Sequence, residues 1–161
     1  MENPPLKSLY QQLILEHYRK PKNKADLPDR TVEVRMTNPV CGDEIVLQLK
    51  IEDDEIRTAR FAGQGCSISQ ASVSMMTALL EGRKLADADG IATRFTQMMH
   101  GDESAAGDRT LGDLRALQGV SKFPVRIKCA LLGFDALLEA LKQSGHTPVV
   151  RDEGDEEGTT P

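Results

Sequence analysis

Alternation of apolar and polar side chains in the first half of this chain constrains its fold most strongly. The alternation covers residues 32–36 and 45–51, and a third, less regular segment covers residues 56–62. Apolar residues at every second position place one face of a strand on a core. The pattern therefore predicts three consecutive strands, joined by turns near residues 38–43 and 52–55.

Helical spacing of apolar residues occupies the sequence on both sides of these strands. The segments with this spacing are residues 6–18, 67–81, 87–99, 110–117 and 124–142. Ser67 or Ser69 is the expected N-cap of the second helix, and a polar loop is expected over residues 101–108. The order of elements predicts an α+β domain, with a three-stranded antiparallel sheet and helices packed on one of its faces.

Length and charge limit the number of domains and the kinds of partner. The 161 residues suit one domain, expected over residues 1–150, followed by a disordered acidic tail over residues 151–161. This tail carries −4 of the net charge of −5, and no basic stripe with interleaved aromatic residues is present, so nucleic-acid binding is not expected. No apolar run approaches the ~18 residues that span a bilayer. The sequence therefore predicts a cytoplasmic protein without a membrane segment.

Three cysteines and one aspartate are the candidate ligands of a metal. Cys41 and Asp43 flank a glycine in the turn between two predicted strands, Cys66 follows a Gly-Gln-Gly sequence, and Cys129 belongs to the last predicted helix. Three thiolates and one carboxylate suit a tetrahedral zinc ion or the iron of a cluster, and suit magnesium or calcium poorly. A thiolate is also a nucleophile, so the same atoms could hold a metal and carry sulfur.

Each cysteine also has a simpler interpretation. Cys41 could be a bystander in an ordinary turn, Cys66 a small residue at a strand-to-helix junction, and Cys129 a core residue. No Cys-x-x-Cys pair is present, and the spacings are not those of a zinc finger or a ferredoxin. Proline and glycine residues, which restrict the backbone or allow it unusual conformations, stand beside the first two cysteines, and this favours a shared site. Arg126 and Lys128 would then offset its negative charge.

Four motifs together resemble those of the SufU proteins, which belong to the IscU-like superfamily of iron–sulfur cluster assembly. They are Leu-Ile-Leu-Glu-His-Tyr at residues 13–18, Asn-Pro-Val-Cys-Gly-Asp at 38–43, Gly-Gln-Gly-Cys-Ser-Ile-Ser at 63–69 and Phe-Pro-Val-Arg-Ile-Lys-Cys-Ala at 123–130. The resemblance extends over residues 6–143. Lys128 stands where IscU scaffolds carry histidine, and Pro124 stands alone where they carry two prolines, so the chain resembles the SufU branch more.

The resemblance implies a function and a set of partners. Cys41, Asp43, Cys66 and Cys129 would bind one Zn²⁺ ion, and the partner would be a SufS-type, pyridoxal-phosphate-dependent cysteine desulfurase. Cys41 would accept persulfide sulfur from that enzyme, after a histidine of the desulfurase replaces Cys41 on the zinc. The sulfur would then pass to a downstream iron–sulfur scaffold. The implied activity is that of a zinc-dependent sulfurtransferase.

Two other functions remain open from the sequence. The first is a scaffold on which a [2Fe–2S] cluster is assembled on the same four ligands and then transferred, with iron or the cluster as cofactor. The second is a purely structural zinc domain, in which no thiol reacts while the metal is bound. The expected exposure of Cys41 in a turn argues against the structural function.

Overall fold

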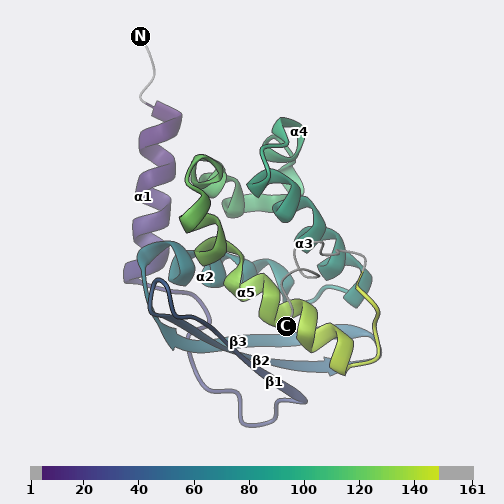
Figure 1. The fold of residues 1–161 in the computed structure, drawn as a ribbon. Helices are drawn as coiled ribbons and strands as arrows, with labels where there is room; N and C mark the ends of the chain where they lie inside the picture. Colours follow the sequence, from purple (N-terminus) through teal and green to yellow (C-terminus); the bar gives the residue numbers. More distant parts are fainter. Residues whose placement is uncertain (1–4, 149–161) are drawn as a thin grey trace.

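The computed structural model describes residues 5–148, and one helix, three strands and a series of helices follow one another as predicted (Figure 1). They are α1 (Pro5–Arg19), β1 (Val32–Asn38), β2 (Asp43–Glu52), β3 (Glu55–Gln64), α2 (Ser67–Leu80), α3 (Leu85–Met99), α4 (Glu103–Ala106), the 3-10 helix η1 (Arg109–Lys122) and α5 (Pro124–Gln143). The predicted disordered tail, residues 151–161, lies outside the described residues. Within the described residues, no helix is both long and apolar enough to span a bilayer.

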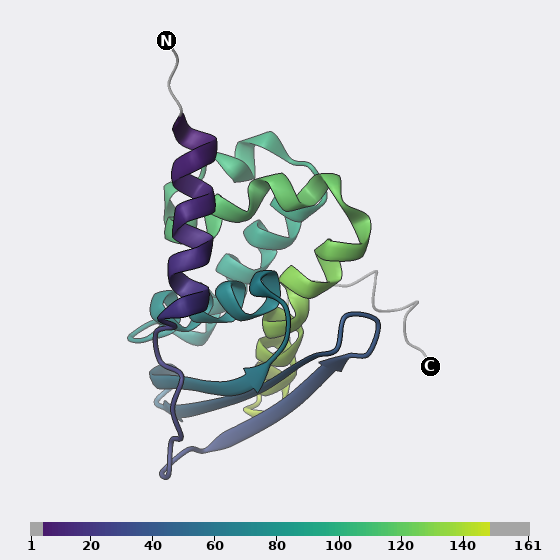
Figure 2. The same cartoon turned by 90° about the vertical axis from the view of Figure 1, so that its left-hand side faces the viewer.

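The three strands form one antiparallel sheet in the order β1-β2-β3. Val34 pairs with Leu47, which in turn pairs with Phe61, and all three side chains are buried. This shared face carries the helices: α5 packs on β1 and β2, and α2 packs on β3. Figure 2 shows the helices stacked on one side of the sheet. The α+β fold predicted from the sequence is therefore confirmed.

The core lies between the sheet and the helices, with α2 at its centre. Most of α2 is buried, because α1 and α5 pack against it in addition to the sheet. Phe95 of α3 and Phe134 of α5 stack in the core, with ring centroids 4.7 Å apart. His17 of α1 is also buried, and its ring nitrogens lie 2.7 Å from Ser74 Oγ and 2.9 Å from Asp113 Oδ2. These contacts join α1 to α2 and η1.

Three local expectations were wrong. The N-cap of α2 is Cys66 rather than Ser67 or Ser69, because its sulfur accepts the backbone N–H of Ser69 at 3.4 Å. The expected polar loop over residues 101–108 contains the one-turn helix α4. The expected short helix is the longer η1, which is interrupted at Gly112 with φ +53°. Side chains that cap helices are polar, as loop residues are. Composition alone therefore does not distinguish a capped short helix from a loop over residues 101–122.

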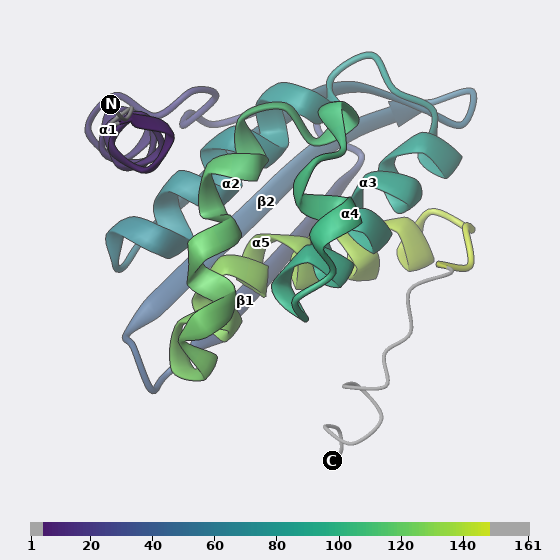
Figure 3. The ribbon, with the colours of Figure 1, turned by 90° about the horizontal axis from the view of Figure 1, so that it is seen from above.

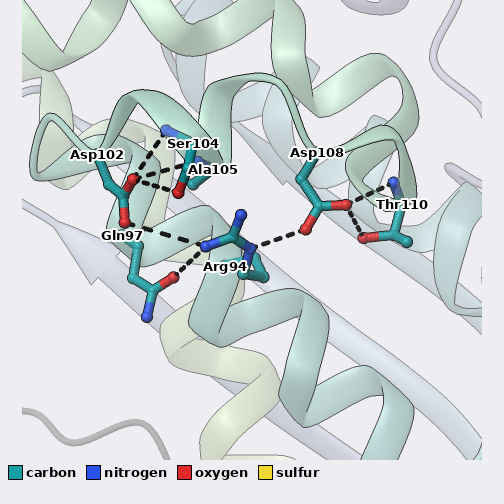
Figure 4. Close-up of polar contacts among 7 residues, drawn as sticks. All are labelled: Arg94, Gln97, Asp102, Ser104, Ala105, Asp108 and Thr110. Carbon is teal, nitrogen blue, oxygen red and sulfur yellow. Dashed lines mark hydrogen bonds and ion pairs between the residues drawn. The ribbon is translucent and has the colours of Figure 1, made fainter.

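Arg94 of α3 connects the caps of the two elements that follow (Figure 4). The Asp102 carboxylate accepts the N–H groups of Ser104 and Ala105 and so caps α4. Asp108 caps η1 through Thr110, and it accepts Arg94 Nε–H at 2.8 Å. Hydrogen bonds from Thr110 and then Arg94 lower the pKa of Asp108 from 3.8 to about 2. Charged caps therefore stabilise residues 101–122.

We expect the stabilisation by Asp108 to disappear in acid. Because the folded-state pKa lies below the unfolded value, the contribution is full above pH 3.8 and is lost as the pH falls through about 2. Asp108→Asn keeps a capping oxygen but removes the charge that Arg94 contacts. Urea unfolding should show the wild type more stable than this variant at neutral pH, with the difference shrinking between pH 3.8 and 2. A difference that is independent of pH would contradict the assignment.

Candidate metal centre

The turn between β1 and β2 carries the first two candidate ligands. The N–H of Cys41 donates to the carbonyl oxygen of Asn38 at 3.2 Å and closes the turn, and Asn38 pairs with Asp43 across it. Asp43 opens β2 and is only 2% exposed, whereas Cys41 is half-buried and its neighbour Val40 is exposed. The turn therefore directs a carboxylate inward and leaves a thiol accessible.

The junction between β3 and α2 lies against Asp43 and carries Cys66. Gly65 has φ +151°, and a Cβ atom at this position would lie 2.3 Å from Asp43 Oδ1. Only glycine leaves room for that carboxylate. The N–H of Cys66 donates to the same Oδ1 atom at 2.8 Å. Asp43 is thus held by the backbone segment that carries Cys66.

Cys129 approaches the same place from α5. It is fully buried, and its Sγ lies 3.0 Å from Cys41 Sγ. The buried Asn38 amide donates to Cys129 Sγ, with Nδ2 3.8 Å from the sulfur. Asn38 was not among the predicted site residues, although it begins the Asn-Pro-Val-Cys motif. It contacts both cysteines, one through its backbone carbonyl and the other through its side chain.

A metal-sized cluster of ligand atoms results from this convergence. The ligand atoms of Cys41, Asp43 and Cys129 all lie within 4.8 Å of one another. Cys66 is outside this set, but it lies close enough to raise the pKa of the Cys129 thiol. Asp43 Oδ2 is buried without a hydrogen-bond partner among the described residues. A buried carboxylate oxygen without a partner is costly, and a bound cation would compensate for it.

The electrostatics of the cluster also favour a cation. Burial raises the pKa of the Cys129 thiol strongly, and the neighbouring Cys41 and Asp43 raise it further. The hydrogen bond with Cys129, followed by the charge of Cys66, raises the pKa of Arg126, so this guanidinium belongs to the cluster's surroundings. Lys128 is exposed, and its role as charge support stays a prediction. A divalent cation would allow the buried thiols to ionise.

The residues present fit a zinc ion. Thiolates and a carboxylate are common Zn²⁺ ligands, and the unpaired Asp43 oxygen is a ready donor. Soft sulfur ligands disfavour magnesium and calcium. The same ligands also suit iron. The composition of the site therefore favours thiophilic metals as a class and does not distinguish zinc from iron.

Comparison with known proteins identifies the family. The model of the NifU-like N terminal domain family matches residues 9–143. The chain belongs to this family. A zinc-dependent sulfurtransferase SufU of Bacillus subtilis is 49% identical over 135 residues, which cover 84% of this chain and 90% of that protein. An iron–sulfur cluster assembly scaffold protein IscU of Streptococcus pyogenes is 40% identical over 153 residues, 95% of each chain.

A solved structure supports the fold of this NifU-like domain. The crystal structure of the N-terminal part of a nitrogen-fixing NifU-like protein from Brucella abortus matches with a TM-score of 0.76, covering 86% of this chain and 95% of that one. Its sequence identity is 21%, so the match concerns the fold alone. The family model and the sequence relatives confirm the family resemblance seen in the sequence motifs.

Proposed function

We propose that this protein is a zinc-dependent sulfurtransferase of iron–sulfur cluster assembly. Cys41 accepts sulfur from the persulfide of a SufS-type cysteine desulfurase, and the sulfur then passes to a downstream scaffold. The observation that carries the proposal is the half-buried Cys41 thiol, 3.0 Å from the sulfur of Cys129 and beside the unpaired oxygen of Asp43. The 49% identity to the Bacillus SufU supports the same activity.

Cys41, Asp43, Cys66 and Cys129 would hold the zinc ion. Bound zinc supplies a positive charge that keeps the thiols deprotonated while moderating their reactivity. Arg126 adds a second positive charge from the start of α5, and we assign Lys128 the same supporting role. Asn38 orients Cys129 through its amide and holds the Cys41 turn through its carbonyl.

Sulfur transfer needs no external oxidant or reductant. The Cys41 thiolate attacks the outer sulfur of the donor persulfide, and a new bond forms between that sulfur and Cys41 Sγ. The sulfur–sulfur bond of the donor breaks, and its cysteine leaves as a thiolate. The proton of the donor persulfide stays with the transferred sulfur, so the products are a persulfide on Cys41 and a free donor thiolate.

The alternative function is assembly of a [2Fe–2S] cluster on the same ligands. The 40% identity to the Streptococcus IscU scaffold is the observation that favours it. Against it stands Lys128 at the position where the resemblance expects histidine in a scaffold. The scaffold requires iron for its activity, whereas the sulfurtransferase does not.

Alanine formation by the cysteine desulfurase separates these functions. The desulfurase is assayed with reductant and with this protein in zinc-loaded, metal-stripped or iron-loaded form. A sulfurtransferase predicts that the zinc-loaded form stimulates many turnovers without iron. Stimulation that requires iron, with accumulation of a coloured cluster, would instead establish the scaffold.

A further inference from the structure

The Cys129 thiol lies on the core side of the Cys41 thiol. Cys41 is half-buried in the turn between β1 and β2, whereas Cys129 is fully buried on α5, and their sulfurs are 3.0 Å apart. Figure 3 shows α5 lying across the strands that this turn connects. The turn and the helix therefore hold two thiols in contact, one facing solvent and one facing the core.

The third cysteine is less well placed to react with Cys41. The Cys66 sulfur accepts the backbone N–H of Ser69 at 3.4 Å and so serves as the N-cap of α2. The Cys129 sulfur belongs to the set of ligand atoms that lie within 4.8 Å of one another, and the Cys66 sulfur does not. Cys129 is therefore the thiol within reach of Cys41.

Two elements fix the position of the Cys129 sulfur. The Asn38 amide at the end of β1 donates to this sulfur, with Nδ2 3.8 Å away, and the Val125 carbonyl oxygen of α5 accepts the thiol at 3.9 Å. Because α5 packs on β1 and β2, the distance between the two sulfurs is set by the core and not by a mobile side chain.

We propose that Cys129 is a resolving thiol for sulfur carried on Cys41, an inference that rests on the proposed function. In the metal-free protein, the Cys129 sulfur attacks Cys41 Sγ of the persulfide. A Cys41–Cys129 disulfide forms, and the bond from Cys41 to the outer sulfur breaks. The outer sulfur leaves with the bonding electron pair as hydrosulfide.

The reaction balances without an added oxidant or reductant. The Cys129 sulfur is oxidised to the disulfide, and the outer sulfur of the persulfide is reduced to sulfide. The buried Asp43 oxygen, which has no hydrogen-bond partner among the described residues, accepts the Cys129 proton as the attack begins. The proton then joins the hydrosulfide, so H₂S is released.

The burial of the two cysteines gives the direction of attack. The sulfur donor reaches Cys41 from solvent and leaves the outer sulfur on the solvent side. Cys129 approaches Cys41 Sγ from the core side, opposite to the bond that breaks, which is the line that displacement at sulfur follows. Two thiols held in contact in this way react much faster than free thiols do.

The metal site decides whether the carried sulfur is kept. While Cys129 is a zinc ligand, its nucleophilic electron pair is shared with the metal, and it does not attack the persulfide. The zinc-loaded protein is then a carrier that retains sulfur for the scaffold. The protein that has lost its metal discharges the sulfur as sulfide and closes the acceptor in a disulfide.

The test follows the persulfide after metal removal. Cys41 is loaded in the zinc-bound protein, either by the desulfurase or by cysteine persulfide, and donor and reductant are removed before a chelator is added to half of the sample. The chelated half should release about one sulfide per persulfide and show a disulfide between the Cys41 and Cys129 peptides by mass spectrometry. The zinc-bound half should keep its persulfide at least about ten times longer.

Cys129→Ser separates the resolving thiol from the loss of metal. After chelation, this variant should keep its persulfide at least about ten times longer than the wild type. Cys129→Ala, which places no hydroxyl in the core, should behave in the same way. Cys66→Ser is the matched control, because it also removes a candidate ligand but leaves Cys129 in place, and it should discharge sulfide as fast as the chelated wild type.

Equal persulfide lifetimes in the chelated wild type and in both Cys129 variants would overturn the proposal. Release of sulfide without a Cys41–Cys129 disulfide would overturn it as well. Failure of the proposed function gives a different result: the desulfurase then places no sulfur on Cys41. Cysteine persulfide still loads the thiol in that case, and the chelation experiment tests the resolving reaction by itself.

Discussion

Replacing Cys41 with serine is expected to abolish sulfur acceptance from the desulfurase. A serine hydroxyl keeps its proton at neutral pH and does not attack a persulfide, so the acceptor is lost although the side chain is nearly the same size. Cys41 is only half-buried, and the metal-free variant should differ in unfolding free energy by no more than about 1 kcal/mol. Desulfurase stimulation should fall at least about a hundredfold.

Cys129→Ser is the matched control for this experiment. Cys129 is buried, so its replacement disturbs the ligand set but leaves the accessible Cys41 thiol in place. Mass spectrometry after donor treatment should find one added sulfur on Cys41 in the Cys129→Ser protein, formed more slowly than in the wild type because a zinc ligand is missing, and none on the Cys41→Ser protein. Near-normal stimulation by Cys41→Ser, with sulfur on Cys66 or Cys129, would disprove the assignment of Cys41 as the acceptor.

Replacing Gly65 with alanine is expected to disrupt the metal centre and to destabilise the fold. The added Cβ would lie 2.3 Å from Asp43 Oδ1 and 2.9 Å from Asp43 Cα, and the second of these atoms is backbone that cannot rotate away. The carboxylate must move, and its hydrogen bond from Cys66 N–H is lost with it. The positive φ adds strain of about 1–3 kcal/mol. We expect zinc affinity to fall by at least about 10- to 100-fold, as measured by competition with a chelator.

Gly82→Ala separates the steric effect from the backbone strain. Gly82 also has a positive φ, +85°, but a Cβ there would have no atom within 4 Å. This variant should lose about 1–2 kcal/mol of unfolding free energy while its zinc affinity is unchanged. Equal zinc affinity in the Gly65→Ala and Gly82→Ala proteins would mean that Asp43 does not contribute to metal binding.

The sheet could be predicted because its signal is local. Side chains on a strand alternate between two faces, so a strand buried on one face is visible in its own residues. The predicted turns near residues 38–43 and 52–55 correspond to the observed gaps between β1 and β2 and between β2 and β3. Residues 101–122 were harder, because Asp102 and Asp108 have the polarity of loop residues and act as helix caps.

The sequence by itself determined the order of the elements, the α+β fold, the family and the chemical types of the four candidate ligands. Each of these depends on periodicity or on a short motif. Only the tertiary structure decided which atoms meet: Cys41 and Cys129 are 88 residues apart and are brought to 3.0 Å by the packing of α5 on β1 and β2. The contact of Asn38 with Cys129 arises from the same packing, and the unpaired Asp43 oxygen lies beside it. Such contacts leave no periodic trace in the sequence, because the residues that make them belong to different elements.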